Sequence, residues 1–104
     1  MNQYDIFTSY ISWGNGGKSR PVLVYALSDK LARVYPITTQ YENKSEAVRA
    51  KYFKIRDWLQ SGLDKQSYVD TGTRLTQPLS MFDNAAPIGI LTESDKKRFI
   101  EFLK

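Results

Sequence analysis

Three closely spaced stretches of β-forming residues constrain this chain more than any other feature. Tyr4 to Trp13, Arg20 to Leu27 and Leu31 to Thr39 each combine aromatic and β-branched residues over the length of a strand. Only the turn Ser28–Lys30 separates the second stretch from the third, which predicts an antiparallel hairpin. The segment Gly14–Ser19 is predicted to be a loop, because glycine tolerates positive φ.

The middle of the chain is ambiguous between helix and strand. Val48 and Tyr52 begin a helical spacing of apolar residues, yet the same segment also alternates as a strand does. We expect a polar loop through Glu46, a strand near Ala50 to Ile55 and a short helix over Asp57–Leu63. Its first residue is a suitable N-cap, and the glycine next to its last residue is a suitable terminator.

The C-terminal segment predicts a helix from Glu93 to Leu103. Thr92 can cap its first backbone N–H groups, and acidic residues in the first turn suit the helix dipole. Its apolar stripe is expected in the core or in a dimer interface, and consists of Phe99, Ile100, Phe102 and Leu103. With short strand pieces around Gly72, the pattern predicts a mainly β fold in a single domain, residues 1–104. We expect a small, strongly curved barrel of five to six strands with a short internal helix and a C-terminal helix.

Composition limits the chemistry. Fifteen Lys and Arg against eleven Asp and Glu give a formal charge of +4, which favours an anionic partner such as nucleic acid. The chain lacks histidine, the usual proton-transfer group at neutral pH, and lacks cysteine, which excludes disulfides and thiolate metal sites. No apolar run approaches the roughly 20 residues that cross a bilayer. The N-terminus also lacks signal-peptide features, so we expect a soluble cytoplasmic protein with no membrane contact.

Two motifs carry a family resemblance. "GGKSRPVLVY" followed by "VYPITTQ", with weaker continuation through "YVDTGTR" and "PIGILTESD", resembles the MazF/PemK toxin ribonucleases of bacterial toxin–antitoxin systems. The order and spacing of these motifs span almost the whole chain. The resemblance implies an SH3-like barrel that forms a homodimer and is inhibited by a cognate antitoxin protein. It also implies cleavage of single-stranded RNA without a metal ion or other cofactor.

The resemblance also assigns site residues. The arginine before the motif proline corresponds to Arg20, and the catalytic threonine to Thr38, with Thr39 as the alternative. Arg20 suits the role, because a guanidinium is always charged and binds phosphate oxygens through two donors. Further RNA contacts are expected from the glycine loop, the second motif and a later arginine: Trp13, Gly16, Gly17, Lys18, Thr39, Gln40 and Arg74. Trp13 could either stack a splayed base or cover the barrel core.

Two other functions stay open on sequence alone. The chain could be a non-catalytic SH3-like module that binds a peptide or a nucleic acid. It could also be a toxin of the same fold that acts on a protein target, as gyrase-directed relatives of this barrel do. The pairing of Arg20 with Thr38 favours RNA cleavage, because a protein-directed toxin has no evident need for both.

Overall fold

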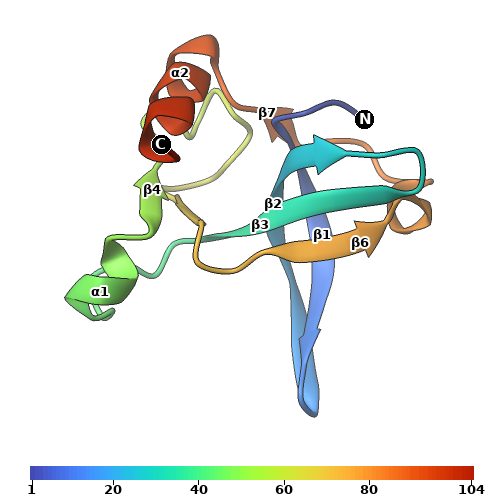
Figure 1. The fold of residues 1–104 in the computed structure, drawn as a ribbon, viewed down its shortest axis with the longest axis horizontal. Helices are drawn as coiled ribbons and strands as arrows, with labels where there is room; N and C mark the ends of the chain where they lie inside the picture. Colours follow the sequence, from blue (N-terminus) through green and yellow to red (C-terminus); the bar gives the residue numbers. More distant parts are fainter.

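The computed structural model describes the whole chain, residues 1–104, as a curled antiparallel sheet flanked by a C-terminal helix (Figure 1). In chain order, its elements are β1 (Asp5–Trp13), β2 (Gly16–Leu27), β3 (Leu31–Thr38), α1 (Glu46–Arg49), β4 (Tyr52–Lys54), β5 (Tyr68–Asp70), β6 (Leu75–Pro78), the 3₁₀ helix η1 (Leu79–Phe82), β7 (Gly89–Ile90) and α2 (Glu93–Phe102). No helix is long and apolar enough to cross a membrane.

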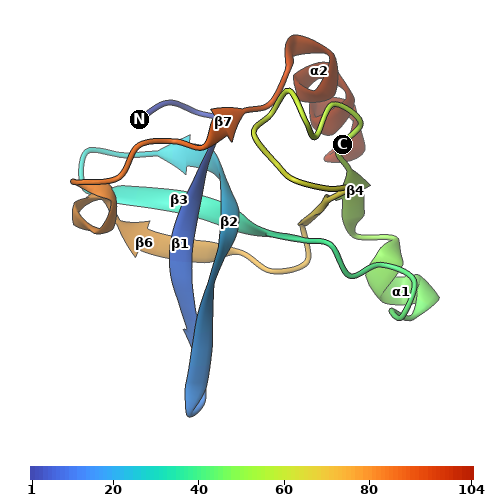
Figure 2. The same ribbon diagram turned by 180° about the vertical axis from the view of Figure 1, so that it is seen from behind.

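The central strand β3 changes partners along its length. β2 pairs with one edge of β3, while the other edge pairs first with β6 and then, at Ile37 and Thr38, with β5. The sheet order is β4-β5-β3-β2-β1-β7, with β6 paired to β3 off this path. Figures 1 and 2 show β1 standing across the direction of β3 and β6, so the sheet curls strongly. This architecture confirms the predicted small β-barrel and its central antiparallel hairpin.

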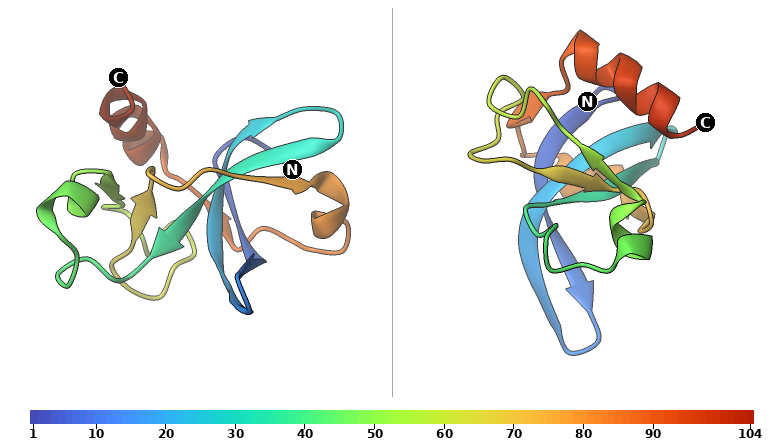
Figure 3. Two further views of the ribbon diagram at one scale, coloured as in Figure 1. Left: turned by 60° about the horizontal axis from the view of Figure 1, so that its bottom comes forward. Right: turned by 90° about the vertical axis from the view of Figure 1, so that its left-hand side faces the viewer.

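The hairpin of β1 and β2 is longer than predicted and projects from the body of the molecule (Figure 3). β2 begins at Gly16, which pairs with Trp13, so the expected loop over Gly14–Ser19 is wrong for all but the two turn residues. Gly14 has a φ of 45°, which is the positive value that a two-residue hairpin turn requires. The residues after the turn are mostly exposed, and their polar character is therefore compatible with a projecting strand.

Two apolar clusters pack on opposite faces of the curled sheet. Alternate residues of β2 enter different clusters, because successive strand side chains point to opposite faces. Leu23 joins a cluster that includes Phe53 and Phe99, whereas Val22 and Val24 join a second cluster. In the predicted helical stripe, only Phe99 is buried in this single chain. The other three side chains of the stripe stay 39–47% exposed.

Two predictions for the middle of the chain were wrong. The helix expected over Asp57–Leu63 is wrong, because the structure contains only turns there, among them a bond from the Ser61 N–H to the Asp57 carbonyl at 3.0 Å. The internal helix is instead α1, which begins at Glu46, the last residue of the expected polar loop. Ser45 caps α1 by accepting a hydrogen bond from the Val48 N–H at 3.3 Å. The strand expected near Ala50 to Ile55 is present as the shorter β4.

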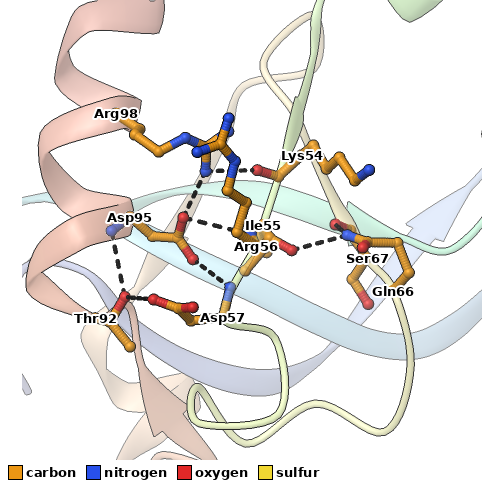
Figure 4. A network of polar contacts seen from close by, with 9 residues as sticks. All are labelled: Lys54, Ile55, Arg56, Asp57, Gln66, Ser67, Thr92, Asp95 and Arg98. Atoms are coloured by element: carbon orange, nitrogen blue, oxygen red, sulfur yellow. Dashed lines mark hydrogen bonds and ion pairs between the residues drawn. The ribbon is translucent and has the colours of Figure 1, made fainter.

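A buried carboxylate holds the start of the Asp57 segment, and Gly62, with a φ of 91°, ends that segment after a single turn. Asp95, on α2, is 0% exposed and accepts hydrogen bonds from the backbone N–H groups of Arg56 and Asp57 at 3.4 and 2.8 Å (Figure 4). Arg98 forms an ion pair with the same carboxylate. Thr92 caps α2 as predicted, by accepting from the Asp95 N–H, and donates its own hydroxyl to the Asp57 carboxylate at 2.6 Å. The network joins α2 to the chain that follows β4.

Replacing Asp95 with alanine should destabilise the fold strongly. The change leaves two backbone N–H groups and the Arg98 guanidinium without their acceptor, and such losses cost about 3 kcal/mol. Urea denaturation followed by circular dichroism measures the difference. Glu93→Ala is the matched control on the same helix, because its ion pair with Lys96 is exposed and should contribute under about 1 kcal/mol. Equal effects of the two substitutions would contradict the role given to Asp95.

Candidate functional site

A hollow of about 220 Å³ lies between the first half of β2 and the end of β3. Most of the site residues predicted from the sequence line it, namely Lys18, Arg20, Thr38, Thr39 and Gln40. The strand register explains the convergence. Val22 pairs with Pro36, and extending that antiparallel register by two residues places Arg20 opposite Thr38.

Arg20 has an unsatisfied donor in this hollow. The residue is half-buried, its Nε atom is buried without a hydrogen-bond partner, and none of the ion pairs in the molecule includes it. Tyr52 lies close enough to Arg20 for the guanidinium charge to act on its phenol. Burial raises the pKa of the Tyr52 phenol, Asp70 raises it further, and the Arg20 guanidinium lowers it. Tyr52 therefore stays neutral at physiological pH and does not compensate the Arg20 charge. An anion placed in the hollow would compensate the charge of the Arg20 guanidinium.

Thr38 offers a hydroxyl beside this guanidinium. Its Oγ1 accepts a hydrogen bond from the Gln40 backbone N–H at 3.1 Å, which orients the side chain and leaves the hydroxyl proton free to donate. Thr38 is half-buried, whereas Thr39 and Gln40 are exposed at the mouth of the hollow. Arg20 and Thr38 thus bring a cation and a neutral hydroxyl to the lining of the same hollow.

A cluster of tyrosines next to the site was not predicted. Tyr68 pairs with Thr38 across the sheet, and Tyr41 stacks on the Tyr68 ring at a centroid separation of 4.4 Å. Tyr52 lies 6.4 Å from Tyr41, and the Arg49 guanidinium covers the Tyr41 ring at 5.6 Å. The sequence does place Tyr52 and Tyr68 on short strands, but only the pairing of β4 with β5 and of β5 with β3 brings them to Thr38.

The predicted hairpin residues divide between the site and the hairpin tip. Lys18 lines the hollow, but Trp13, Gly16 and Gly17 do not. Trp13 is 52% exposed and packs along Gly16, where an added Cβ would lie 3.4 Å from the indole Nε1. Trp13 thus neither covers the barrel core nor contacts the hollow in this structure. Its exposed ring at the tip of the hairpin is available for a ligand that extends beyond the hollow.

The two hairpin glycines should respond differently to substitution. A Cβ on Gly17 would lie 2.4 Å from the Tyr10 hydroxyl oxygen and 2.8 Å from the Ile11 carbonyl, whereas Gly16 has ordinary space. Gly17→Ala should therefore cost about 1–3 kcal/mol through overpacking, and Gly16→Ala should stay within about 0.5 kcal/mol. Thermal denaturation of the two variants measures this difference. A destabilised Gly16→Ala beside an unaffected Gly17→Ala would contradict the hairpin register.

Arg74 lies apart from the hollow. It precedes β6, whose pairing of Leu75 with Val34 directs Arg74 toward Tyr35 on β3. Burial raises the pKa of the Tyr35 phenol, Tyr25 raises it further, and Arg74 acts in the opposite direction. The structure therefore brings Arg74 to the Tyr35 hydroxyl, not to the pair of Arg20 and Thr38.

A larger hollow exists elsewhere in the molecule. It measures about 650 Å³, lies between β4 and α2, and has Phe53 and Phe102 in its wall. Arg98 in its lining is already bound to Asp95 and to the Lys54 carbonyl. We place the candidate site in the smaller hollow, because an unpaired guanidinium and a free hydroxyl converge only there.

The fold is shared with a solved MazF structure. In a comparison with solved structures, the Mycobacterium tuberculosis toxin MazF-mt6 matches 95% of this chain and 91% of its own, with a TM-score of 0.70 and 22% sequence identity. At this identity the likeness establishes a shared fold, and it confirms the fold expected from the motifs. Comparison of the sequence with protein-family models and with curated proteins gave no match.

Proposed function

We propose that this protein is the toxin of a toxin–antitoxin system and a metal-independent endoribonuclease that cleaves single-stranded RNA. The observation that carries this proposal is the convergence of Arg20 and Thr38 in one hollow, where the Arg20 guanidinium has no internal partner. The fold shared with a solved MazF toxin supports it, as does the formal charge of +4. A toxin that cuts messenger RNA would act in the cytoplasm.

The chemistry needs no histidine, because RNA supplies its own nucleophile. The 2′-hydroxyl oxygen attacks the adjacent phosphorus and gives its proton to solvent water, the bond to the 5′-oxygen breaks, and that oxygen takes a proton from water. The products are a 2′,3′-cyclic phosphate and a 5′-hydroxyl. Negative charge builds on the phosphoryl oxygens in between. Arg20 would stabilise that charge with two parallel N–H donors, and Thr38 would donate a hydrogen bond to the same group. Arg20 is not a general base, because its pKa exceeds about 12.

Arg20→Ala and Thr38→Ala should each reduce RNA cleavage about 10²- to 10³-fold without unfolding the protein, because each removes a preorganised donor. Arg20→Lys should be nearly as inactive, since an ammonium group cannot reproduce the planar fork. The measurement is cleavage of a long, sequence-diverse RNA in excess chelator, with the product ends mapped.

Matched controls separate this role from general charge and fold effects. Arg33→Ala removes an exposed arginine from the far part of β3 and should leave cleavage within a few-fold. An inactive Thr39→Ala beside an active Thr38→Ala would move the hydroxyl role by one residue. Strict magnesium dependence or 5′-phosphate ends would contradict the mechanism.

RNA binding without cleavage would support a non-catalytic module instead, and inhibition of gyrase without RNA cleavage would support a protein-directed toxin.

We further propose that the working unit is a homodimer and that an acidic antitoxin segment blocks the RNA site. Ile100 and Phe102 on α2, and Leu103 directly after it, leave apolar surface exposed, as expected of a chain that covers it with a second copy. Lys18 and Arg20 supply the positive charge that an acidic inhibitor would cover in place of RNA.

Sedimentation and competition test this arrangement. The free protein should sediment as a dimer at micromolar concentration, and an acidic antitoxin peptide should displace an uncleavable 2′-deoxy oligonucleotide. Lys18→Ala should weaken both ligands, because they share that cation. A monomer, or a ternary complex in which peptide and oligonucleotide bind without interference, would refute it.

A further inference from the structure

One edge of β4 has no partner strand. β4 is the last strand in the sheet order, and only β5 pairs with it. The backbones of Lys51 and Ile55 bond to the chain that contains β5, at 2.9 and 3.1 Å. Every second residue of an antiparallel strand bonds to the same neighbour, so Phe53 also faces β5, whereas Tyr52 and Lys54 turn their N–H and C=O groups to the free edge.

The helix α2 lies beside this free edge and leaves a hollow next to it (Figure 1). The hollow measures about 650 Å³ and is lined by all three residues of β4 and by one side of α2. The Arg98 guanidinium donates to the Lys54 carbonyl at 3.1 Å, so the backbone groups of this edge point toward the helix (Figure 4). The N–H and C=O of Tyr52 and the N–H of Lys54 remain for a ligand in the hollow.

The hollow has the features of a docking site for an extended peptide. Unpaired backbone groups on a strand edge bind such a peptide, which adds to the sheet as a further strand. A bound strand would direct alternate side chains into the hollow. There Phe102 offers an apolar contact, because its ring is 39% exposed and packs edge-on against Phe53 at a centroid separation of 5.5 Å.

The uncompensated charges in the hollow are positive. Lys54 and Lys97 are exposed, and none of the ion pairs in the molecule includes them. Arg98 already has its ion pair within the protein, and Glu101, the anion in the lining, is paired with Lys104 at 3.1 Å. An acidic peptide would therefore meet two free cations.

The same charges disfavour a second copy of the chain as the occupant. A symmetric dimer brings the same patch of both chains together, so Lys54 and Lys97 would face their own equivalents. Ile100 and Leu103, three residues apart, line no part of the hollow. A dimer contact at those two residues would leave the hollow open.

We propose that an extended acidic segment of a protein partner adds to the free edge of β4 as a further strand, with an apolar side chain against Phe102 and carboxylates at Lys54 and Lys97. The inference takes the proposed antitoxin as the source of this segment, and to that extent it rests on the proposed function. The docking site shares no lining residue with the hollow of Arg20 and Thr38, so it adds a contact region apart from the RNA site.

Fluorescence anisotropy of a synthetic peptide tests the proposal. The probe is a labelled peptide of about six residues that alternates glutamate with valine and carries one phenylalanine. Lys54→Glu and Lys97→Glu should each weaken its binding about 10-fold at low salt, because each reverses a charge that the peptide contacts. Two further peptides, N-methylated on complementary sets of alternate residues, should differ about 10-fold in affinity, because only one set would donate to β4.

Matched variants locate the binding. Lys30→Glu reverses an exposed charge on the turn after β2 and should bind the peptide as the wild type does. Arg20→Ala should also bind it normally, although it should not cut RNA. An equal loss in Lys30→Glu or in Arg20→Ala would overturn the site, and equal affinities of the two methylated peptides would overturn strand addition.

The other occupants give different outcomes. If Lys97→Glu turned a dimer into a monomer in sedimentation, a second copy would fill the hollow and the proposal would be wrong. The same conclusion follows if Lys97→Glu weakens a 2′-deoxy oligonucleotide as much as the peptide, because the hollow would then hold nucleic acid. A protein that cuts no RNA yet binds the peptide at Lys54 and Lys97 would overturn the ribonuclease and leave the docking site standing.

Discussion

The register of β2 against β3 is the constraint on which the core and the candidate site both depend. Pairing Val22 with Pro36 sends Leu23 into one apolar cluster and Val24 into the other. The same register, carried two residues further, sets Arg20 opposite Thr38. A shift by one residue would exchange the faces of the whole strand and expose the core side chains. The geometry of the site is therefore stabilised by the hydrophobic burial that stabilises the sheet.

The buried Asp95 carboxylate has a comparable role at the other end of the molecule. It links α2 to the chain after β4, and its desolvation is offset by two backbone donors and by Arg98. The bonds at Asp57 and at Ser67 support a segment that has no regular secondary structure of its own. A loop held in this way presents its side chains in a fixed place.

Local patterns in the sequence predicted the elements that depend mainly on neighbouring residues. Alternating β-branched residues located the three long strands, and Thr92 before an acidic first turn located α2. The helix expected over Asp57–Leu63 failed, because Gly62 has a φ of 91° and ends the segment after the single turn that the Ser61 N–H closes on the Asp57 carbonyl. The early start of β2 was missed because polar, glycine-rich residues also suit a projecting hairpin that no core covers.

In the candidate site, too, some residues could be found from local motifs and others only from strand pairing. The motifs located Arg20 and Thr38, and the hairpin register brings the two together. Tyr52 was missed, since its position beside Arg20 requires two further strand pairings, β4 with β5 and β5 with β3. Arg74 satisfied the motif, yet its strand pairing turns it toward Tyr35. A motif therefore identifies residue types, while strand pairing decides which of them meet.

The electrostatics of Arg20 distinguish a structural arginine from a ligand-binding one. Arg98 lies on a buried carboxylate and a backbone carbonyl, so its charge is compensated within the protein. Arg20 is half-buried without such compensation, and the Tyr52 phenol, whose pKa the Arg20 charge acts to lower, is neutral at physiological pH. Partial burial of an unpaired cation costs free energy, which an anionic ligand can recover on binding. An anion bound in the hollow would compensate the Arg20 charge, and the Thr38 hydroxyl lies in the lining of the same hollow.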